Sequence, residues 1–374
     1  MRCLTIGWRD AWCIRDTCNA PTESQDTALQ SVQTFVIASA IKSVIALFVL
    51  LTAVAYSVWL ERKVVGHIQN RWGPTRVGPF GLLQPLADGI KFLFKEDLTP
   101  PHVYKTLYIA APMLSVIFAL TSISVIPIGN WVTIAGVHTP LQITDVNIGL
   151  LIILGVTSMG VYGVALAGWS SNSKYSLLGG LRASAQMVSY EISLGLSLIG
   201  VLIMAGSFSL REIVDAQGGT FWGFIPRWNL FHGQTVAFFV YLMSAFAETN
   251  RVPFDLPEAE TELVAGYHTE YSAMKFAMFF MAEYANMITV ACLATLLFLG
   301  GWHGPIGGPA WLQAMLPVFW FVLKVFCFLF LYIWIRGTLP RFRYDQLMAF
   351  AWKFLFPLAV ANLVVTGLIV ALRS

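Results

Sequence analysis

Long apolar stretches, separated by short polar ones, account for most of this chain. A membrane-spanning helix needs about 20 predominantly apolar residues, and eight stretches reach or approach that length. They lie at approximately 34–60, 106–127, 147–168, 183–206, 233–250, 270–299, 312–335 and 347–371. The pattern predicts an all-α, polytopic integral membrane protein with eight transmembrane helices.

The first 33 residues differ from the rest. They contain Arg2, Arg9 and Arg15 and no continuous apolar core, so they do not have the pattern of a signal peptide. We interpret residues 1–33 as an N-terminal extension and expect it to be poorly ordered. Residues 34–374 then form the transmembrane domain.

The composition agrees with a membrane protein. Hydrophobic residues make up 57% of the chain and charged residues only 11%, whereas about a quarter of the residues in soluble proteins are charged. The formal net charge of +3 is small and the basic residues mostly border the apolar stretches, so nothing favours nucleic-acid binding.

Lys and Arg residues are distributed unevenly between the two sets of loops. The loops that we expect to be basic and cytoplasmic are 61–105, 169–182, 251–269 and 336–346. The loops of the opposite set contain only Arg211 and Arg227. With an even number of spans, both termini then lie outside the cytoplasm, which in a bacterium is the periplasmic side.

The first cytoplasmic loop contains a helical pattern from Phe80 to Lys95. Polar and apolar positions alternate there with the period of a helix, and the polar face consists of Gln84, Asp88, Lys91 and Lys95. At about 16 residues with internal charges, this helix is too short to cross a bilayer and is typical of an amphipathic helix at the interface. The pattern alone leaves open whether it is a peripheral anchor or gates a substrate.

Acidic residues concentrate after the fifth apolar stretch. Of only 20 acids in the chain, one group falls within a short region and comprises Glu248, Asp255, Glu258, Glu260, Glu262 and Glu270. Asp255 and Glu258 could simply cap a loop helix. The spacing of Asp255, Glu258 and Glu262 would also place three carboxylates on one helical face.

Glu191 and Glu283 fall inside predicted spans, and Glu248 and Glu270 fall at the edges of spans. Acids at such depth are costly, and they mark functional sites by default. The alternative is a permanently protonated acid that bonds to a neighbouring helix.

Several kinds of chemistry have no motif in this sequence. The five cysteines include no C-x-x-C pair, and the chain has neither a dinucleotide-binding glycine motif nor a phosphate-binding loop. All six histidines fall in predicted loops, which disfavours haem ligation between spans. We therefore expect no redox centre bound by this chain, and chemistry based on carboxylates, arginines and a shaped cavity.

Four stretches carry a resemblance to a known family. They are ERKVVGHIQNRWGPTRVGPFGLLQPLADGIKFLFKED, YSLLGGLRASAQMVSYE, AETNRVPFDLPEAETELVAGYHTEYSAMKFAMFFMAEY and LPRFRYDQLM. From residue 35 to its end, the chain resembles the quinone-site membrane subunit of respiratory complex I, the bacterial NADH:quinone oxidoreductase. The resemblance implies eight spans, a quinone chamber shared with the peripheral arm, and a chain of buried carboxylates that couples quinone reduction to proton translocation.

The resemblance also implies roles for individual residues. The residues that it assigns to the quinone chamber are Arg62, Asp88, Arg251, Asp255, Glu258, Glu260 and Glu262. The residues that it assigns to a proton or charge relay are Glu191, Glu248, Glu270 and Glu283, with Arg182 as a nearby basic partner. Arg62 and Arg251 could instead form structural ion pairs.

By the same resemblance, the substrate is a quinone, either ubiquinone or menaquinone, and this chain binds no cofactor. NADH, FMN and the iron–sulfur clusters belong to partner subunits. The implied partners are the quinone-site and iron–sulfur subunits of the peripheral arm, the small membrane subunits and the antiporter-like subunits. The implied location is the bacterial inner membrane.

Three other functions remain open from the residues. A homologous subunit of a membrane-bound hydrogenase-type complex would share the fold and the carboxylates. A secondary transporter would be expected to show related halves, but the acids cluster in one loop and its flanking spans. A purely structural anchor would not need acids within its spans.

Overall fold

The computed structural model describes residues 22–373 apart from 130, 135–136, 222–224, 256–264 and 306–308. Glu258, Glu260 and Glu262, which we expect in the quinone chamber, lie outside the described residues. The chain divides into two compact units, Met1–Lys42 and Ser43–Ser374. The contacts that form the site lie within the second unit.

Helices make up most of the described chain. The long ones are α1 (Thr22–Ile68), α3 (Lys105–Ser122), α4 (Gly149–Ser170), α5 (Lys174–Ala205), α9 (Ala273–Phe298), α10 (Ala310–Thr338) and α12 (Phe356–Arg373). The shorter ones are α2 (Gln84–Phe94), α6 (Leu210–Ala216), α7 (Thr235–Glu248) and α11 (Tyr344–Phe350), with a π-helical turn at Ala351–Leu355 and 3₁₀ turns at Pro79–Gly81, Ile123–Val125 and Gly266–His268.

Two small antiparallel hairpins lie in loops of the set expected outside the cytoplasm. In the first, β1 (Trp131–Ile134) pairs with β2 (Val137–Pro140). In the second, β3 (Thr220–Phe221) pairs with β4 (Ile225–Pro226). Neither hairpin extends into a larger sheet in the described part of the chain, so the architecture depends on helix packing.

Seven helices in the described residues are long and apolar enough to cross a membrane. They confirm the prediction of a helical, multi-pass membrane protein. The fifth expected span contains only α7, whose 14 residues cover about 21 Å at the rise of an α-helix. A hydrocarbon core is about 30 Å thick, so the count of eight stays a prediction.

The two ends of the first predicted span differ from expectation. Helix α1 begins at Thr22, inside the segment interpreted as an extension, and continues through the Glu61–Lys63 triplet to Ile68. Its C-terminal turns therefore carry three charged side chains on a rigid helix and not on a loop. This continuation fixes the position of Glu61 relative to the other helices.

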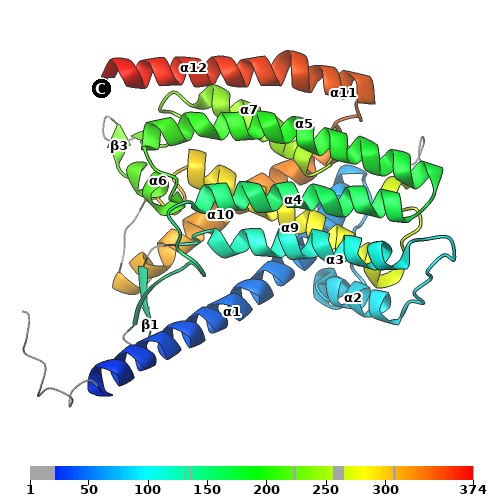
Figure 1. Ribbon diagram of the computed structural model, residues 1–374, viewed down its shortest axis with the longest axis horizontal. Helices are drawn as coiled ribbons and strands as arrows, with labels where there is room; N and C mark the ends of the chain where they lie inside the picture. Colours follow the sequence, from blue (N-terminus) through cyan, green and yellow to red (C-terminus); the bar gives the residue numbers. More distant parts are fainter. Residues whose placement is uncertain are drawn as a thin grey trace, which may run out of the picture. The chain divides into compact units, whose positions relative to one another are not determined.

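In Figure 1, α12, α5, α4 and α3 lie side by side in that order, and each packs against the next. Helix α9 packs against both α3 and α10 and is the most buried candidate span, with 61% of its apolar window inside the protein. By contrast, only 17% of the window that includes α12 is buried. Helix α9 is therefore the centre of the helix packing.

Helices α4 and α5 approach closely at a pair of glycines. A Cβ atom added to Gly180 would lie 3.0 Å from the Cα of Gly168 and 3.3 Å from the carbonyl oxygen of Val164. Small residues at such crossings let helix backbones pack closely within a membrane. This contact fixes the depth at which α5 lies against α4.

We expect Gly180→Val to force α4 and α5 apart and to lower the free energy of unfolding by about 1–3 kcal/mol. Gly195→Val, on the same helix, is the matched control because no atom lies within 4 Å of the added Cβ. The thermal stability of the two purified variants in detergent measures the difference. Equal stability would show that the glycine contact is unimportant.

Candidate functional site

The segment that follows α7, Thr249–Asp255, turns the chain into the protein interior. After Glu248 the backbone enters the left-handed region at Asn250 (φ 49°), a conformation that Asn tolerates better than most residues. The Arg251 N–H then donates to the carbonyl oxygen of Phe246 at 3.3 Å. As a result, Arg251 and Asp255 are almost fully buried, with 5% and 3% of their surfaces exposed.

Glu61, near the C-terminal end of α1, joins three other elements. Its Oε2 atom accepts a hydrogen bond from the Tyr284 hydroxyl at 2.8 Å and lies 3.3 Å from Nη1 of Arg251. Its Oε1 atom accepts a hydrogen bond from Nη1 of Arg336. One buried carboxylate therefore binds α9, α10 and the Thr249–Asp255 segment to α1.

Arg251 also contacts a second carboxylate. Its Nε atom lies 2.8 Å from Oε1 of Glu283, and its guanidinium lies 4.2 Å from the centre of the Tyr284 ring. A guanidinium has five N–H donors in a fixed planar arrangement, so it can hold two carboxylates at once. Arg251 is thus a shared cation between Glu61 and Glu283.

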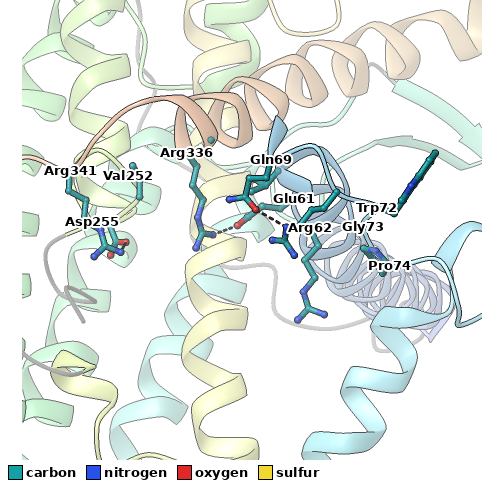
Figure 2. Close-up of a pocket in the computed structure, with 13 residues that line it drawn as sticks. Glu61, Arg62, Gln69, Trp72, Gly73, Pro74, Val252, Asp255, Arg336 and Arg341 are labelled. Atoms are coloured by element: carbon teal, nitrogen blue, oxygen red, sulfur yellow. Dashed lines mark hydrogen bonds and ion pairs between the residues drawn. The ribbon is translucent and has the colours of Figure 1, made fainter. Parts of the chain in front are cut away.

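A cavity of about 630 Å³ opens beside Glu61, and we call it the chamber. Its volume is within the range of small-molecule sites. Its charged lining consists of Glu61, Arg62, Arg71, Asp255, Arg336 and Arg341. Figure 2 shows Arg341 and Asp255 at one end, Trp72 and Pro74 at the other, and Arg336 pointing at Glu61 between them.

The rim of the chamber depends on a close backbone contact. The chain leaves α1 and returns so that a Cβ atom added to Gly73 would lie 2.9 Å from the Cα of Lys63. Only glycine fits there without displacing backbone. At the opposite end, Nη2 of Arg341 donates to Oδ2 of Asp255 at 2.9 Å, which neutralises a buried acid.

A second, much smaller cavity lies on the other side of Arg251, and we call it the inner cavity. Its volume of about 30 Å³ is enough for one or two water molecules. Its polar lining consists of Ser115, Glu248, Thr249, Asn250, Tyr267, Glu283 and Asn286. Glu283 lines this cavity and also binds Arg251. Arg251 therefore connects the inner cavity to Glu61, which lines the chamber.

The expected chamber residues Arg62 and Asp88 form an ion pair of 2.6 Å. Asp88 also accepts a hydrogen bond from Gln84 at 3.1 Å, so it is held from its own helix α2. Arg62 lines the chamber. Asp88 does not line the chamber itself but helps to hold Arg62 through the ion pair.

The expected relay residues fall into separate groups. Glu248 and Glu283 share the inner cavity. Glu191 is half-buried and accepts a hydrogen bond from Ser158 of α4. Glu270, which lies between α7 and α9 in the chain, has one carboxylate oxygen 3.9 Å from Nε2 of His102.

Arg182 lies against the Tyr344 ring, 5.6 Å from its centre. It is nine residues before Glu191 on α5, which places the two side chains on opposite faces of the helix and about 14 Å apart along its axis. The role that the resemblance implies for Arg182, a basic partner of the relay acids, stays a prediction.

His268 is buried among the aromatic rings of Phe276, Phe279 and Phe280. Burial lowers its pKa to about 3, so it stays neutral at physiological pH. In the described part of the chain, no three His, Cys, Asp or Glu side chains cluster as they would around a metal ion.

One family of known proteins matches most of the chain. The sequence model of the family described as NADH dehydrogenase covers residues 41–367. The chain belongs to the NADH dehydrogenase family. Members of this family that match it closely are subunits of NADH-quinone oxidoreductase, and this chain is accordingly a membrane subunit of that proton-translocating complex.

Three relatives, each an H subunit of NADH-quinone oxidoreductase, illustrate the match. The chain is 71% identical over 356 residues to the relative from Koribacter versatilis (strain Ellin345), an alignment that covers 92% of this chain and 99% of the relative. It is 52% identical to the relative from Solibacter usitatus (strain Ellin6076), with the same coverage. It is 51% identical to the relative from Geobacter sulfurreducens, with 88% and 94% covered.

Among the residues of the site, Glu61, Arg336 and Arg341 have no assigned role in the sequence pattern. Glu61 only ends a predicted span there, and Arg336 and Arg341 are only cytoplasmic charges. The available signals are the position of Glu61 beside Arg62 and the basic residues of the LPRFRYDQLM stretch. Neither signal says that these residues meet.

Replacing Glu61 by Gln should destabilise this family member strongly. Arg251 and Arg336 would lose their shared counter-ion in a buried site, and breaking a buried ion pair costs about 3–5 kcal/mol. The thermal stability of the assembled complex in detergent measures the loss.

Asp345→Asn is the matched control, because Asp345 faces Arg343 at 3.8 Å with both side chains more than 70% exposed. Exposed pairs contribute at most about 1 kcal/mol. Similar stabilities of the two variants would mean that Glu61 is not the counter-ion on which the network depends.

Proposed function

We propose that the chamber binds the head group of a quinone and that Arg251 couples the reduction of this quinone to proton movement in the membrane. The observation that carries the proposal is the position of Arg251 between Glu61 of the chamber and Glu283 of the inner cavity, at 3.3 and 2.8 Å.

The chamber has the donors that a quinone needs. Its wall carries arginines whose guanidinium groups can donate hydrogen bonds to quinone oxygens and stabilise the negative charge that develops on them during reduction. NADH, FMN and iron–sulfur clusters supply the electrons from partner subunits. Residues of the peripheral arm complete the chamber on its cytoplasmic side.

Charge in the chamber would reach the inner cavity through Arg251. A negative charge on the quinone competes with Glu61 for Arg251 and Arg336, and any movement of Arg251 away from Glu283 removes a cation from that carboxylate. A carboxylate that loses a nearby cation gains affinity for a proton. As the quinone is reduced, Glu283 would take up a proton through the inner cavity, which it lines.

The relay would continue from the inner cavity to Glu191. Glu248 lines the inner cavity beside Glu283 and interacts electrostatically with Glu191. Water in the inner cavity could connect Glu283 with Glu248. The proposed path therefore runs from Glu283 through Glu248 to Glu191, while Glu270 lies just before the N-terminus of α9.

Glu191→Gln and Glu283→Gln remove titration but keep size and hydrogen-bonding capacity. We expect each variant to assemble and to lose proton translocation or turnover in vesicles that contain the whole complex. Proton uptake and NADH oxidation are measured in the same vesicles. Glu212→Gln, an exposed acid of α6, is the control. Native ratios of protons to electrons in both variants would refute the relay.

The membrane arrangement that we propose has eight crossings. Helix α7 and the Thr249–Asp255 segment together form the crossing that α7 is too short to complete alone. Helix α2 lies in the cytoplasmic interface, because Leu86, Leu93 and Phe94 expose 63%, 68% and 86% of their surfaces beside a charged face. Both termini lie on the periplasmic side of a bacterial inner membrane.

Accessibility labelling tests this topology. In a background without the native cysteines, Lys95→Cys should react only from the cytoplasmic side and Glu212→Cys only from the periplasmic side, since both positions are exposed. Oriented membrane vesicles and a membrane-impermeant maleimide give the two accessibilities. The reverse labelling of either position would overturn the orientation.

A further inference from the structure

Gln186 of α5 is fully buried and joins the last turn of α7 to the end of the Thr249–Asp255 segment. Its side-chain Nε2 donates to the carbonyl oxygen of Ala247 at 2.9 Å and to that of Phe254 at 2.7 Å. An amide NH₂ group has two hydrogens, so Gln186 uses its full donor capacity on this one part of the backbone.

These two carbonyl groups lie on either side of Arg251 in sequence. Ala247 is wholly buried and Phe254 is 1% exposed, so water does not readily replace a lost donor there. Without Gln186 the Ala247 carbonyl oxygen would keep the Asn250 N–H as a donor, at 3.3 Å, and the Phe254 carbonyl oxygen would lose the Gln186 donor, which destabilises the present backbone position. The backbone would move to regain partners, and Arg251 would move with it.

Packing holds the same segment from the side but does not fix its ends together. The Tyr190 ring lies 5.7 Å from the Phe254 ring, and the Pro253 carbonyl oxygen accepts a hydrogen bond from Phe342 N–H at 3.1 Å. These contacts act on the later part of the segment only. Backbone hydrogen bonds from the Arg251 N–H to the Phe246 carbonyl oxygen and from the Phe254 N–H to the Arg251 carbonyl oxygen also hold the segment. Gln186 adds a side-chain link from another helix, between Ala247 in the last turn of α7 and Phe254.

We propose that Gln186 is a positioning residue for quinone reduction and its coupling: it sets where the Arg251 guanidinium lies between Glu61 and Glu283 and where Asp255 meets the chamber. This inference rests on the proposed function. The contacts of Arg251 are of hydrogen-bond length, so a shift of about 1 Å would break at least one of them. Misplacement of that size costs on the order of a hundredfold in rate.

Gln186→Met tests the inference, because Met has a similar length and no donor. In the assembled complex we expect a rise in the KM for a short-chain quinone of roughly ten- to a hundredfold, together with weaker binding of quinone-site inhibitors. Electron transfer from NADH to ferricyanide, which needs no quinone, should stay at the native rate. Gln186→Glu, which retains the length and can donate only one hydrogen bond when protonated, should show an intermediate effect at low pH.

Gln142→Met is the matched control. Gln142 is also buried and donates to a backbone carbonyl, that of Val125, at 2.8 Å, but it does not touch the Thr249–Asp255 segment. We expect this variant to keep the native KM for quinone even if it loses stability.

Two results would overturn the positioning role. One is an assembled Gln186→Met complex with native KM and native inhibitor binding. The other is a failure of both Gln186 variants to assemble while Gln142→Met assembles, which would assign Gln186 a purely structural role. Arg251→Lys, measured in parallel, distinguishes a failure of the positioning role from a failure of the proposed function. An altered KM for quinone in Arg251→Lys with a native KM in Gln186→Met refutes the positioning role alone. A native KM in both variants also refutes quinone binding in the chamber.

Discussion

The buried guanidinium of Arg251 is the charge on which the rest of the site depends. A cation is expensive to remove from water and is tolerated only when carboxylates and hydrogen bonds compensate it. Here Glu61 and Glu283 provide the charge, and the Tyr284 ring covers the guanidinium face. Because these partners belong to α1 and α9, the ion pairs also fix how these two helices meet at the site.

Arg251 reaches its buried position because helix α7 ends before it. Helix α7 stops at Glu248, and the following residues turn into the protein interior. In the proposed arrangement they complete the membrane crossing that α7 begins. Irregular backbone at such depth is tolerated when protein surrounds it. Gln186 donates hydrogen bonds to the carbonyl oxygen of Phe254 in this irregular segment and to that of Ala247 in the last turn of α7. The short helix and the buried polar segment are therefore two aspects of one feature.

The fold class could be predicted from the sequence because it has a local signal, whereas the roles of the individual site residues stay predictions. Apolar stretches identified the helices, and the acids around Glu248 together with Arg62 and Arg251 marked the chemistry. The network itself has no local signal. Glu61 is separated from Arg251 by 190 positions and from Arg336 by 275, and no spacing rule reaches so far.

The most direct test of the account replaces Arg251 by Lys and follows quinone reduction and proton translocation in the same vesicles. Lysine keeps the positive charge but, as a point donor on a flexible stem, does not reproduce the planar contact with two carboxylates. Arg343→Lys, at an exposed position, serves as the control. We expect Arg251→Lys to lower the number of protons moved per electron and Arg343→Lys to leave it unchanged. A native ratio at native turnover in Arg251→Lys would contradict it.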